Sequence, residues 1–213
     1  ELLETTLFEK KIPNPFGLAA GFDKSAEVYN SLFKLGYGFV EVGTVTPKRQ
    51  LGNPKPRVFR LEKDQALINR LGFNNHGSEE VASRISKNLP NGLLGINIGP
   101  NKDTNNKEED YFLCLSRLSS NAGYITINIS SPNTEGLRDF HDQKELEKLL
   151  KGIENVKKQH NISKPIAIKL SPDIADNQIS IIYELIKKFN ISGIIISNTT
   201  DKNRENLSDI KKS

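Results

Sequence analysis

The stretch from Tyr124 to Leu170 decides the fold. It opens with the apolar run Tyr124-Ile-Thr-Ile-Asn-Ile129 and closes with Pro165-Ile-Ala-Ile-Lys-Leu170. Between these runs, Lys144 to Gln159 carries leucine, isoleucine and valine at helical spacing. Short runs rich in isoleucine and valine, apolar at most positions, are typical of parallel strands that are covered on both faces. A strand, a helix and a second strand in this order predict a parallel β–α–β unit.

The same alternation continues on both sides of this stretch. Further helical periodicity occurs over Ser25 to Leu35 and over Gln178 to Phe189. The other strand-like runs are Pro15 to Ala20, Phe39 to Val45, Leu93 to Ile98 and Ile191 to Ser197. Six strand–helix units predict an α/β fold, a (β/α)8 TIM barrel whose last two units are absent, since a complete barrel takes about 250 residues. The alternative is an open doubly wound sheet, but its Gly-x-Gly-x-x-Gly turn after the first strand is absent.

The region from Pro47 to Asn69 interrupts the alternation. It is rich in proline and glycine and contains the short runs Arg57 to Arg60 and Ala66 to Ile68, which predict a β-hairpin insertion at about residues 47–69. No linker divides the rest, so we expect residues 1–213 to form one barrel domain. The chain contains no methionine, even at position 1. We therefore expect this domain to be incomplete at both ends.

Composition excludes several classes of protein. The net charge is only +4, and lysine and arginine are interleaved with acidic residues, so the basic stripe of a nucleic-acid-binding protein is absent. No apolar run approaches the length of a membrane span, which predicts that this chain alone is soluble. The single cysteine, Cys114, lies in an apolar run and indicates a buried thiol rather than a nucleophile. The three histidines are far apart, so we expect surface or capping roles and no metal site.

Polar residues occur near the C-terminal ends of four predicted strands. They are Asn97, Asn128, Lys169 and Asn198. In a parallel barrel these strand ends form the mouth of the active site. One asparagine alone is typical of an ordinary strand end, but four polar residues at matching depth favour a binding site. Lys169 lies inside an apolar run, and a buried ammonium requires an anion, which an anionic cofactor would supply. An edge strand would instead leave Lys169 exposed.

Two loops that follow strands have compositions suited to ligand binding. Asn128-Ile-Ser-Ser-Pro-Asn-Thr134 is crowded with amides and hydroxyls, which suit a planar ring with alternating C=O and N–H groups. Ala19-Ala-Gly-Phe-Asp-Lys24 has small residues that let a flat ligand approach, and its lysine suits a carboxylate. No histidine adjoins the serines, so a Ser-His-Asp hydrolase is not indicated. Each loop by itself also fits an ordinary turn.

Together with their surroundings, these residues resemble class 2 of the dihydroorotate dehydrogenase family. The resemblance runs in family order over nearly the whole chain. Its stretches are Asn14-Pro-Phe-Gly-Leu-Ala-Ala-Gly-Phe-Asp-Lys24, Gly38-Phe-Val-Glu-Val-Gly-Thr-Val-Thr-Pro47, Pro56-Arg-Val-Phe-Arg60, Ile68-Asn-Arg-Leu-Gly-Phe-Asn-Asn75, Asn128-Ile-Ser-Ser-Pro-Asn-Thr134 with Gly136-Leu-Arg138, Ile168-Lys-Leu-Ser-Pro-Asp173 and Ser197-Asn-Thr-Thr200.

The resemblance implies an FMN-dependent oxidoreductase that converts (S)-dihydroorotate to orotate in de novo pyrimidine biosynthesis. It implies an FMN site formed by Ala20, Gly21, Phe22, Asp23, Lys24, Thr44, Asn97, Asn128, Lys169 and Ser197. It implies a dihydroorotate or orotate site formed by Lys24, Asn69, Arg70, Leu71, Gly72, Phe73, Asn128, Asn133, Asn198 and Thr199. The implied catalytic residues are Ser131, which takes the C5 proton, and Lys169, which stabilises charge on the reduced flavin.

The resemblance also implies partners and a location. Class 1 relatives carry cysteine where this chain has Ser131, so the serine points to a quinone acceptor, either ubiquinone or menaquinone. Contact with a membrane is expected through an N-terminal region outside this sequence. The expected location is the surface of the bacterial cytoplasmic membrane, or of the mitochondrial inner membrane in a eukaryote. The family's last two strands, whose loops hold the FMN phosphate, also have no counterpart here.

Two other functions are compatible with parts of this pattern. The first is another FMN barrel oxidoreductase that acts on a different flat heterocycle, which the paired motifs around Asn69 and Ser131 disfavour. The second is an inactive, truncated barrel fragment that serves as a folding or interaction module, and bound flavin would distinguish it from an enzyme.

Overall fold

Six parallel strands form a single sheet in the computed structural model, which describes residues 2–134 and 136–209. The strand order β10-β9-β8-β7-β4-β3 follows the chain, so each strand lies beside its predecessor in the series. This order is that of a (β/α)8 barrel, whereas a doubly wound sheet reverses its order at a switch point. The strands are β3 (Gly17–Leu18), β4 (Phe39–Val45), β7 (Leu93–Ile98), β8 (Tyr124–Asn128), β9 (Ile166–Leu170) and β10 (Gly193–Ile196). All six predicted strands are confirmed.

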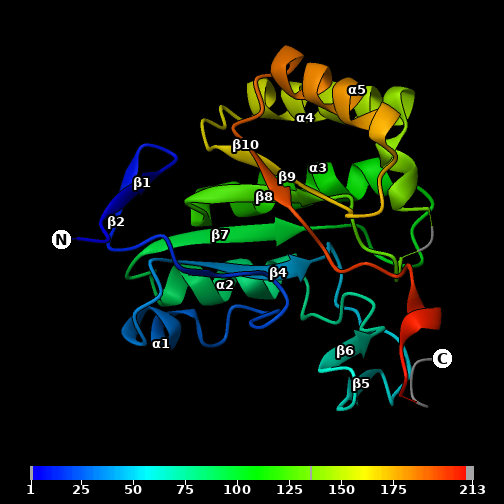
Figure 1. Cartoon of the computed structure of the whole chain (residues 1–213). Coiled ribbons are helices and arrows are strands. Elements are labelled where there is room, and N and C mark those ends of the chain that lie inside the picture. The colour runs from blue at the N-terminus through cyan, green and yellow to red at the C-terminus, as the bar shows by residue number, and fades with distance from the viewer. Residues whose placement is uncertain (1, 135, 210–213) are drawn as a thin grey trace.

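Helices cover the outer face of this sheet (Figure 1). The two predicted amphipathic helices near the C-terminal end are confirmed as α4 and α5, each within two residues of its expected start. The helices are α1 (Tyr29–Lys34), α2 (Ser78–Lys87), α3 (Lys107–Leu118), α4 (Gln143–Gln159) and α5 (Asp176–Lys188), with short 3-10 helices at Ser119–Asn121, Arg138–His141 and Arg204–Asn206.

The predicted helix from Ser25 to Leu35 is wrong at its start, because α1 begins only at Tyr29. Ala26 has a left-handed backbone with φ of 55°, which a right-handed helix cannot include. The Asp23 carboxylate holds this turn by accepting hydrogen bonds from the backbone N–H groups of Glu27 and Val28, both at 2.8 Å. The apolar spacing therefore indicates the helix correctly, but it does not indicate the turn that precedes it.

Two antiparallel hairpins lie outside the parallel sheet. The pair β5 (Val58–Leu61) and β6 (Ala66–Asn69) falls within the predicted 47–69 region and lies beside the carboxyl ends of the sheet (Figure 1). The pair β1 (Thr5–Leu7) and β2 (Lys10–Ile12) was not predicted. Its turn is made by Phe8 and Glu9 with φ of 50° and 63°, without the glycine or asparagine that usually signals such a turn.

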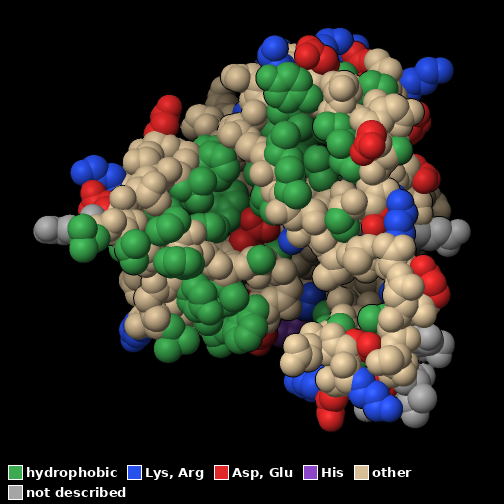
Figure 2. All heavy atoms as spheres, viewed as in Figure 1, with side chains coloured by type: hydrophobic (Ala, Val, Ile, Leu, Met, Phe, Trp, Pro, Cys, Tyr) green, Lys and Arg blue, Asp and Glu red, His purple; other side chains and the backbone are tan. Residues whose placement is uncertain are grey.

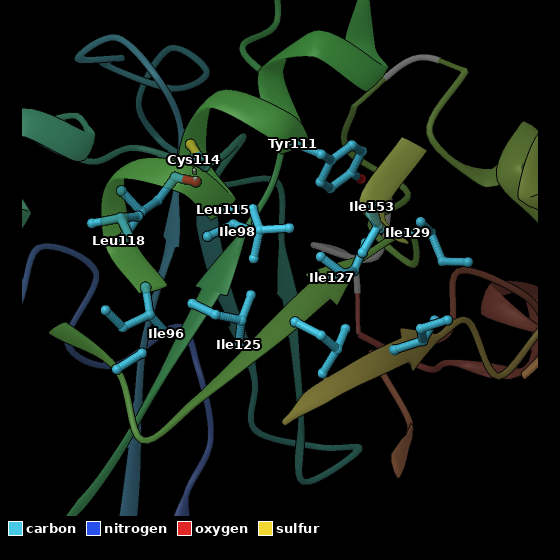
Figure 3. Close-up of a cluster of buried hydrophobic side chains, with 14 of the residues drawn as sticks. Ile96, Ile98, Tyr111, Cys114, Leu115, Leu118, Ile125, Ile127, Ile129 and Ile153 are labelled. Carbon is cyan, nitrogen blue, oxygen red and sulfur yellow. Dashed lines mark hydrogen bonds between the residues drawn. The ribbon is translucent and has the colours of Figure 1, made fainter. Parts of the chain in front are cut away.

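The main core lies between the sheet and the helices. Successive side chains of a strand point to opposite faces, so each strand contributes alternate residues to this layer. Ile96, Ile98, Ile125 and Ile127 are fully buried there, together with residues of α3 (Figure 3). The alternate positions on the inner face are polar toward the carboxyl ends of the strands. They include Glu41, Asn97, Thr126, Asn128 and Lys169, all of them buried.

Cys114 has the buried environment that its sequence context predicts. It lies on α3 with its thiol inside the core (Figure 3), where burial raises the thiol pKa well above its usual range. Within residues 2–134 and 136–209, no cluster of histidine, cysteine and acidic side chains is arranged to hold a metal ion. Over the same residues, no helix is both long enough and apolar enough to cross a membrane.

Candidate active site

A cavity of about 160 Å³ opens at the carboxyl ends of the parallel strands. Its wall combines residues from the loops after β3, β8 and β10, from strands β4 and β9, from the last residues of β6 and β8, and from the segment after β6. The wall residues are Ala20, Gly21, Lys24, Thr44, Asn69, Leu71, Gly72, Phe73, Asn128, Ser131, Pro132, Asn133, Lys169, Asn198 and Thr199. Of these only Pro132 was not predicted. In Figure 2 the hollow between the sheet and the β5–β6 hairpin contains basic side chains.

Two lysines make the cavity electrostatically positive. Burial, followed by the charges of Arg57 and Lys169, lowers the pKa of Lys24 to about 8. Lys169 is only 7% exposed, and no ion pair to it is found among the residues that the structure describes. An uncompensated buried ammonium is costly, so this pair of lysines calls for an anionic ligand.

Three polar side chains bond to one another, two of them in the wall and one behind it. The hydroxyl of Thr44 donates to Asn97 Oδ1 at 2.7 Å. The Asn128 amide donates to the same oxygen at 3.1 Å and to Thr44 Oγ1 at 3.0 Å. Asn97 is fully buried and stands one layer below the cavity, so it supports the wall residues Thr44 and Asn128 rather than lining the wall itself.

A buried carboxylate, Glu41 on β4, lies beneath this group. Its Oε1 accepts a hydrogen bond from Asn97 Nδ2 at 2.9 Å. Its Oε2 accepts from the Tyr124 hydroxyl at 3.0 Å and from the Thr126 hydroxyl at 2.8 Å. Glu41 was not predicted as a site residue. The available signal was an acidic residue inside an otherwise apolar strand, which is rare unless the carboxylate is paired or hydrogen-bonded.

The loop after β8 contains two serines, of which Ser131 lines the cavity. Ser131 is 4% exposed, and its Oγ accepts a hydrogen bond from the backbone N–H of Asn133 at 3.2 Å. In the described part of the chain, no hydrogen bond joins this hydroxyl to a histidine or a carboxylate, as expected for a site that is not a hydrolase triad. The neighbouring Ser130 donates its hydroxyl proton to Asn128 Oδ1 at 2.7 Å and accepts from Asn198 Nδ2 at 2.9 Å.

Arg138 joins the loops that follow β8, β9 and β10. Its Nε donates to the backbone carbonyl of Ser130 at 3.4 Å. Its two terminal nitrogens form ion pairs with Asp173 at 3.1 Å and with Asp201 at 2.9 Å. The arginine itself lies on a short 3-10 helix within the loop that carries the serines. This loop is thereby fixed to its two neighbours across the mouth of the sheet.

His141 caps backbone groups in the same region. Its Nδ1 lies 2.9 Å from the Arg138 carbonyl, and its Nε2 accepts from the backbone N–H of Ser171 at 3.3 Å. These two contacts require a neutral ring with the proton on Nδ1. Burial, supported by the nearby Arg138 charge, lowers the pKa of His141, which keeps the ring neutral. The histidine therefore has the capping role that the sequence suggests.

Besides Asn97, four predicted ligand residues lie outside the cavity wall. Phe22 is 67% exposed, and Asp23 caps the turn before α1. The guanidinium of Arg70 stacks on a phenylalanine ring at 4.8 Å. Ser197 donates its hydroxyl to the backbone carbonyl of Asn198 at 2.9 Å. Each adjoins a wall residue in sequence, so the roles expected of all four remain predictions.

The wall fits a planar anionic cofactor. Amides and hydroxyls offer the donors and acceptors that a flat ring with carbonyl and N–H groups requires, while two lysines offer charge. Gly21 has φ of 118°, and a Cβ there would meet no atom within 4 Å, so the backbone is open to a flat ligand at this point. These features agree with the FMN site that the resemblance implies.

Comparisons with known proteins identify the family. Residues 2–213 match the family model described as dihydroorotate dehydrogenase. Proteins named dihydroorotate dehydrogenase (quinone) from Bartonella tribocorum and Christiangramia forsetii are each 48% identical and align with 93% of this chain. The chain spans 56% and 58% of their lengths.

A solved structure shows the same architecture. The crystal structure of the Eimeria tenella enzyme, titled as DHODH in complex with ferulenol, superposes with a TM-score of 0.91 at 37% identity. The superposition covers 99% of this chain and 63% of that one. The strand order and the polar residues at the carboxyl ends of the sheet agree with these matches. The chain therefore belongs to the dihydroorotate dehydrogenase family, in the class that is named for quinone.

Proposed function

We propose that this chain carries the active site of an FMN-dependent enzyme that oxidises (S)-dihydroorotate to orotate in de novo pyrimidine biosynthesis. The observation that carries the proposal is the convergence of Ser131, Lys24 and Lys169 on one polar cavity in a member of this family. This oxidation requires three groups: a proton acceptor, a cation that binds the substrate carboxylate, and a buried cation that stabilises the reduced ring.

FMN is the cofactor of this proposal, and when bound it supplies the acceptor for the hydride from C6 of the substrate. Ala20 and Gly21 offer exposed backbone to its ring, while Thr44 and Asn128 offer polar groups. Lys169 would hold the cofactor through its fixed positive charge, which would favour the reduced, more negative form.

The remaining wall residues are assigned to the substrate. The Lys24 ammonium binds the carboxylate of dihydroorotate, and the amides of Asn69, Asn133 and Asn198 bind its ring. Ser131 Oγ takes the proton from C5 as the hydride leaves C6. The serine must release its own hydroxyl proton at the same time, and Thr134, which is also buried, or a water molecule relays that proton outward.

The electron acceptor of this proposal is a quinone, either ubiquinone or menaquinone. The named relatives support this assignment. A second cavity of about 570 Å³ shares Gly21, Lys24 and Leu71 with the first, and its mostly polar and charged lining includes the exposed apolar side chains Phe22 and Leu51. Because quinones reside in membranes, we place the protein at the surface of the bacterial cytoplasmic membrane or the mitochondrial inner membrane.

Two measurements on the intact gene product test the proposal. The visible absorption spectrum should show bound flavin at close to one per chain, and dihydroorotate should bleach it in a single turnover. Ser131→Ala should slow this bleaching by about two to four orders of magnitude, the range expected for a lost general base. Bound flavin should be unchanged, since Ser131 has no assigned contact with the cofactor.

Ser120→Ala is the matched control, because this exposed serine lies near the opposite end of the strands, before β8. It should bleach at the wild-type rate. A colourless wild-type protein would contradict the enzyme assignment and favour a fragment that serves only folding or interaction. A Ser131→Ala protein that bleaches at the normal rate would exclude Ser131 as the base.

A further inference from the structure

We propose that Glu41 is a positioning residue that sets which polar groups the floor of the FMN site presents to the cofactor. It acts through Asn97 on Thr44 and Asn128. This inference deepens the proposed function and rests on it for the identity of the cofactor. Glu41 itself does not line the cavity.

The first step is that Glu41 acts purely as an acceptor. Its side chain is 4% exposed, and both carboxylate oxygens face donors, namely the Asn97 amide, the Tyr124 hydroxyl and the Thr126 hydroxyl. Burial, then the nearby Glu41 charge, raises the pKa of Tyr124 well above its usual range, so the phenol keeps its proton and donates. Three donors satisfy the buried carboxylate without a cation.

The second step is that this acceptor fixes the Asn97 amide. An asparagine side chain has an NH2 edge and an oxygen edge that are nearly equal in shape, so its orientation depends on its partners. Asn97 Nδ2 faces Glu41 Oε1 at 2.9 Å, which leaves Asn97 Oδ1 facing the wall residues Thr44 and Asn128. Asn128 and Asn198 are held differently, since the oxygen of each accepts a backbone N–H, from Ser130 and Thr199 respectively.

The third step carries the orientation to the cavity wall. With its oxygen facing the wall, Asn97 accepts from the Thr44 hydroxyl at 2.7 Å and from Asn128 Nδ2 at 3.1 Å. The Thr44 hydroxyl proton therefore points at Asn97, away from the cavity. Thr44 Oγ1 in turn accepts from Asn128 Nδ2 at 3.0 Å. The Thr44 hydroxyl therefore presents a lone pair to a ligand. Without Glu41, Asn97 Nδ2 loses its acceptor, and the amide is held only by the donor Asn128 Nδ2 on its oxygen side. A rotation of the amide would then release the Thr44 proton toward the cavity.

Three substitutions of Glu41 distinguish the effect of losing its hydrogen-bond acceptor from the effect of losing its negative charge. Glu41→Leu and Glu41→Ala both remove the acceptor, and Ala leaves polar space for water if Leu prevents folding. Because water both donates and accepts, it does not select the NH2 edge of Asn97 as the carboxylate does, and Asn128 Nδ2 alone then orients the amide. Glu41→Gln removes the charge but keeps the pattern, since its oxygen can face Asn97 while its NH2 donates to the two hydroxyls, which rotate to accept.

The measurement is the dissociation constant of FMN from the apoprotein, followed by flavin fluorescence, with thermal unfolding as the check on folding. Glu41→Ala and Glu41→Leu should weaken FMN binding by about 10- to 100-fold, as expected for mispaired polar groups in a buried site. Glu41→Gln should recover most of that loss. Equal FMN affinity in Glu41→Ala and the wild type would overturn the inference, and so would a Glu41→Gln protein as weak as Glu41→Ala.

Tyr124→Phe is the matched control for a merely structural effect. It deletes a hydrogen bond to the same carboxylate, but at Oε2, away from Asn97. Stability should fall, while FMN affinity should stay within about threefold of the wild type because the bond between Asn97 and Glu41 remains. A Tyr124→Phe protein with the full loss of affinity would also overturn the inference. Since FMN binding does not require dihydroorotate, a wild type that binds FMN without oxidising dihydroorotate would refute the proposed function alone.

Discussion

At the scale of single residues, the two lysines of the site differ in how their charge is held. Lys169 lies within β9, in register with Asn128 of β8, so the sheet fixes its position. Lys24 lies on a loop, half-buried, and its ammonium is repelled by Arg57 and by Lys169. The sequence predicts that both lysines face the site. It does not predict the lowered pKa of Lys24, because burial of the ammonium, which is the largest cause, and the proximity of Arg57 both depend on how distant segments pack.

The Lys24 pKa of about 8 makes binding of an anion depend on pH. An anionic ligand favours the protonated lysine, so in the proposed site orotate should bind most tightly below pH 8 and should require proton uptake above it. The orotate dissociation constant should rise by up to about tenfold per pH unit as the pH increases beyond that pKa. A titration of the flavin spectrum with orotate between about pH 6.5 and about pH 9.5 measures this slope.

Lys24→Arg is the control for this pH dependence. A guanidinium stays protonated over the whole range, so the slope should vanish even if the affinity changes. The same slope in the wild type and in Lys24→Arg would assign the titration to another group.

At the scale of elements, the accuracy of the sequence predictions depends on how local the signal is. Helix α4 was predicted within one residue from its own apolar spacing. Its start is also fixed locally, since the Asp142 carboxylate accepts from the Lys144 N–H at 2.9 Å. The start of α1 was missed because a left-handed alanine has no sequence signature. The network beneath the cavity was also missed, because Glu41 finds its partners on β7 and β8 through sheet register.

The loop between β8 and α4 is the element that holds Ser131, and Arg138 fixes it. Arg138→Gln removes two ion pairs that connect this loop to the loops after β9 and β10. Because a base must stay within hydrogen-bonding reach of its proton, bleaching of the flavin by dihydroorotate should slow by about 10- to 100-fold. Flavin content should be nearly unchanged, and hydrogen exchange of the loop should accelerate.

Arg117→Gln is matched to Arg138→Gln in exposure and in partners. Arg117 is 29% exposed, against 27% for Arg138, and it also bonds a serine and an acidic residue, on α2. It lies on α3, outside the wall of the site. Its loss should leave the bleaching rate unaltered. If both variants bleach equally slowly, general destabilisation rather than loop position explains the effect.

At the scale of the whole molecule, one buried layer supports the site from behind. Alternate residues of one strand serve the core and the site. In β8, Ile125 and Ile127 are buried in the core, whereas Thr126 and Asn128 lie on the side of the site. The parallel sheet and the position of its mouth could therefore be predicted from apolar runs that end in polar residues. The hydrogen-bond partners within the mouth could not, because they depend on how six strands align.

Deleting core volume in this layer should cost stability. Ile125 is completely buried, so Ile125→Ala should lower the free energy of unfolding by about 2–5 kcal/mol. Ile179→Ala on α5 is the comparison, since Ile179 is 50% exposed and its truncation should cost less than about 1 kcal/mol. Urea denaturation measures both losses. Equal losses would contradict the location of the core between the sheet and the helices.

The hairpin β1–β2 has a practical consequence for handling this protein. Phe8 packs on the Tyr124 ring at 5.0 Å, and Ile12 is buried against Leu93 and Tyr124. The hydroxyl of that same tyrosine reaches Glu41. A protease that cuts at the turn of the hairpin, or a cloning boundary set after Pro13, would uncover the tyrosine and give water a path to the carboxylate. Preparations clipped at the N-terminus should therefore lose flavin on storage even though every residue of the cavity wall is intact.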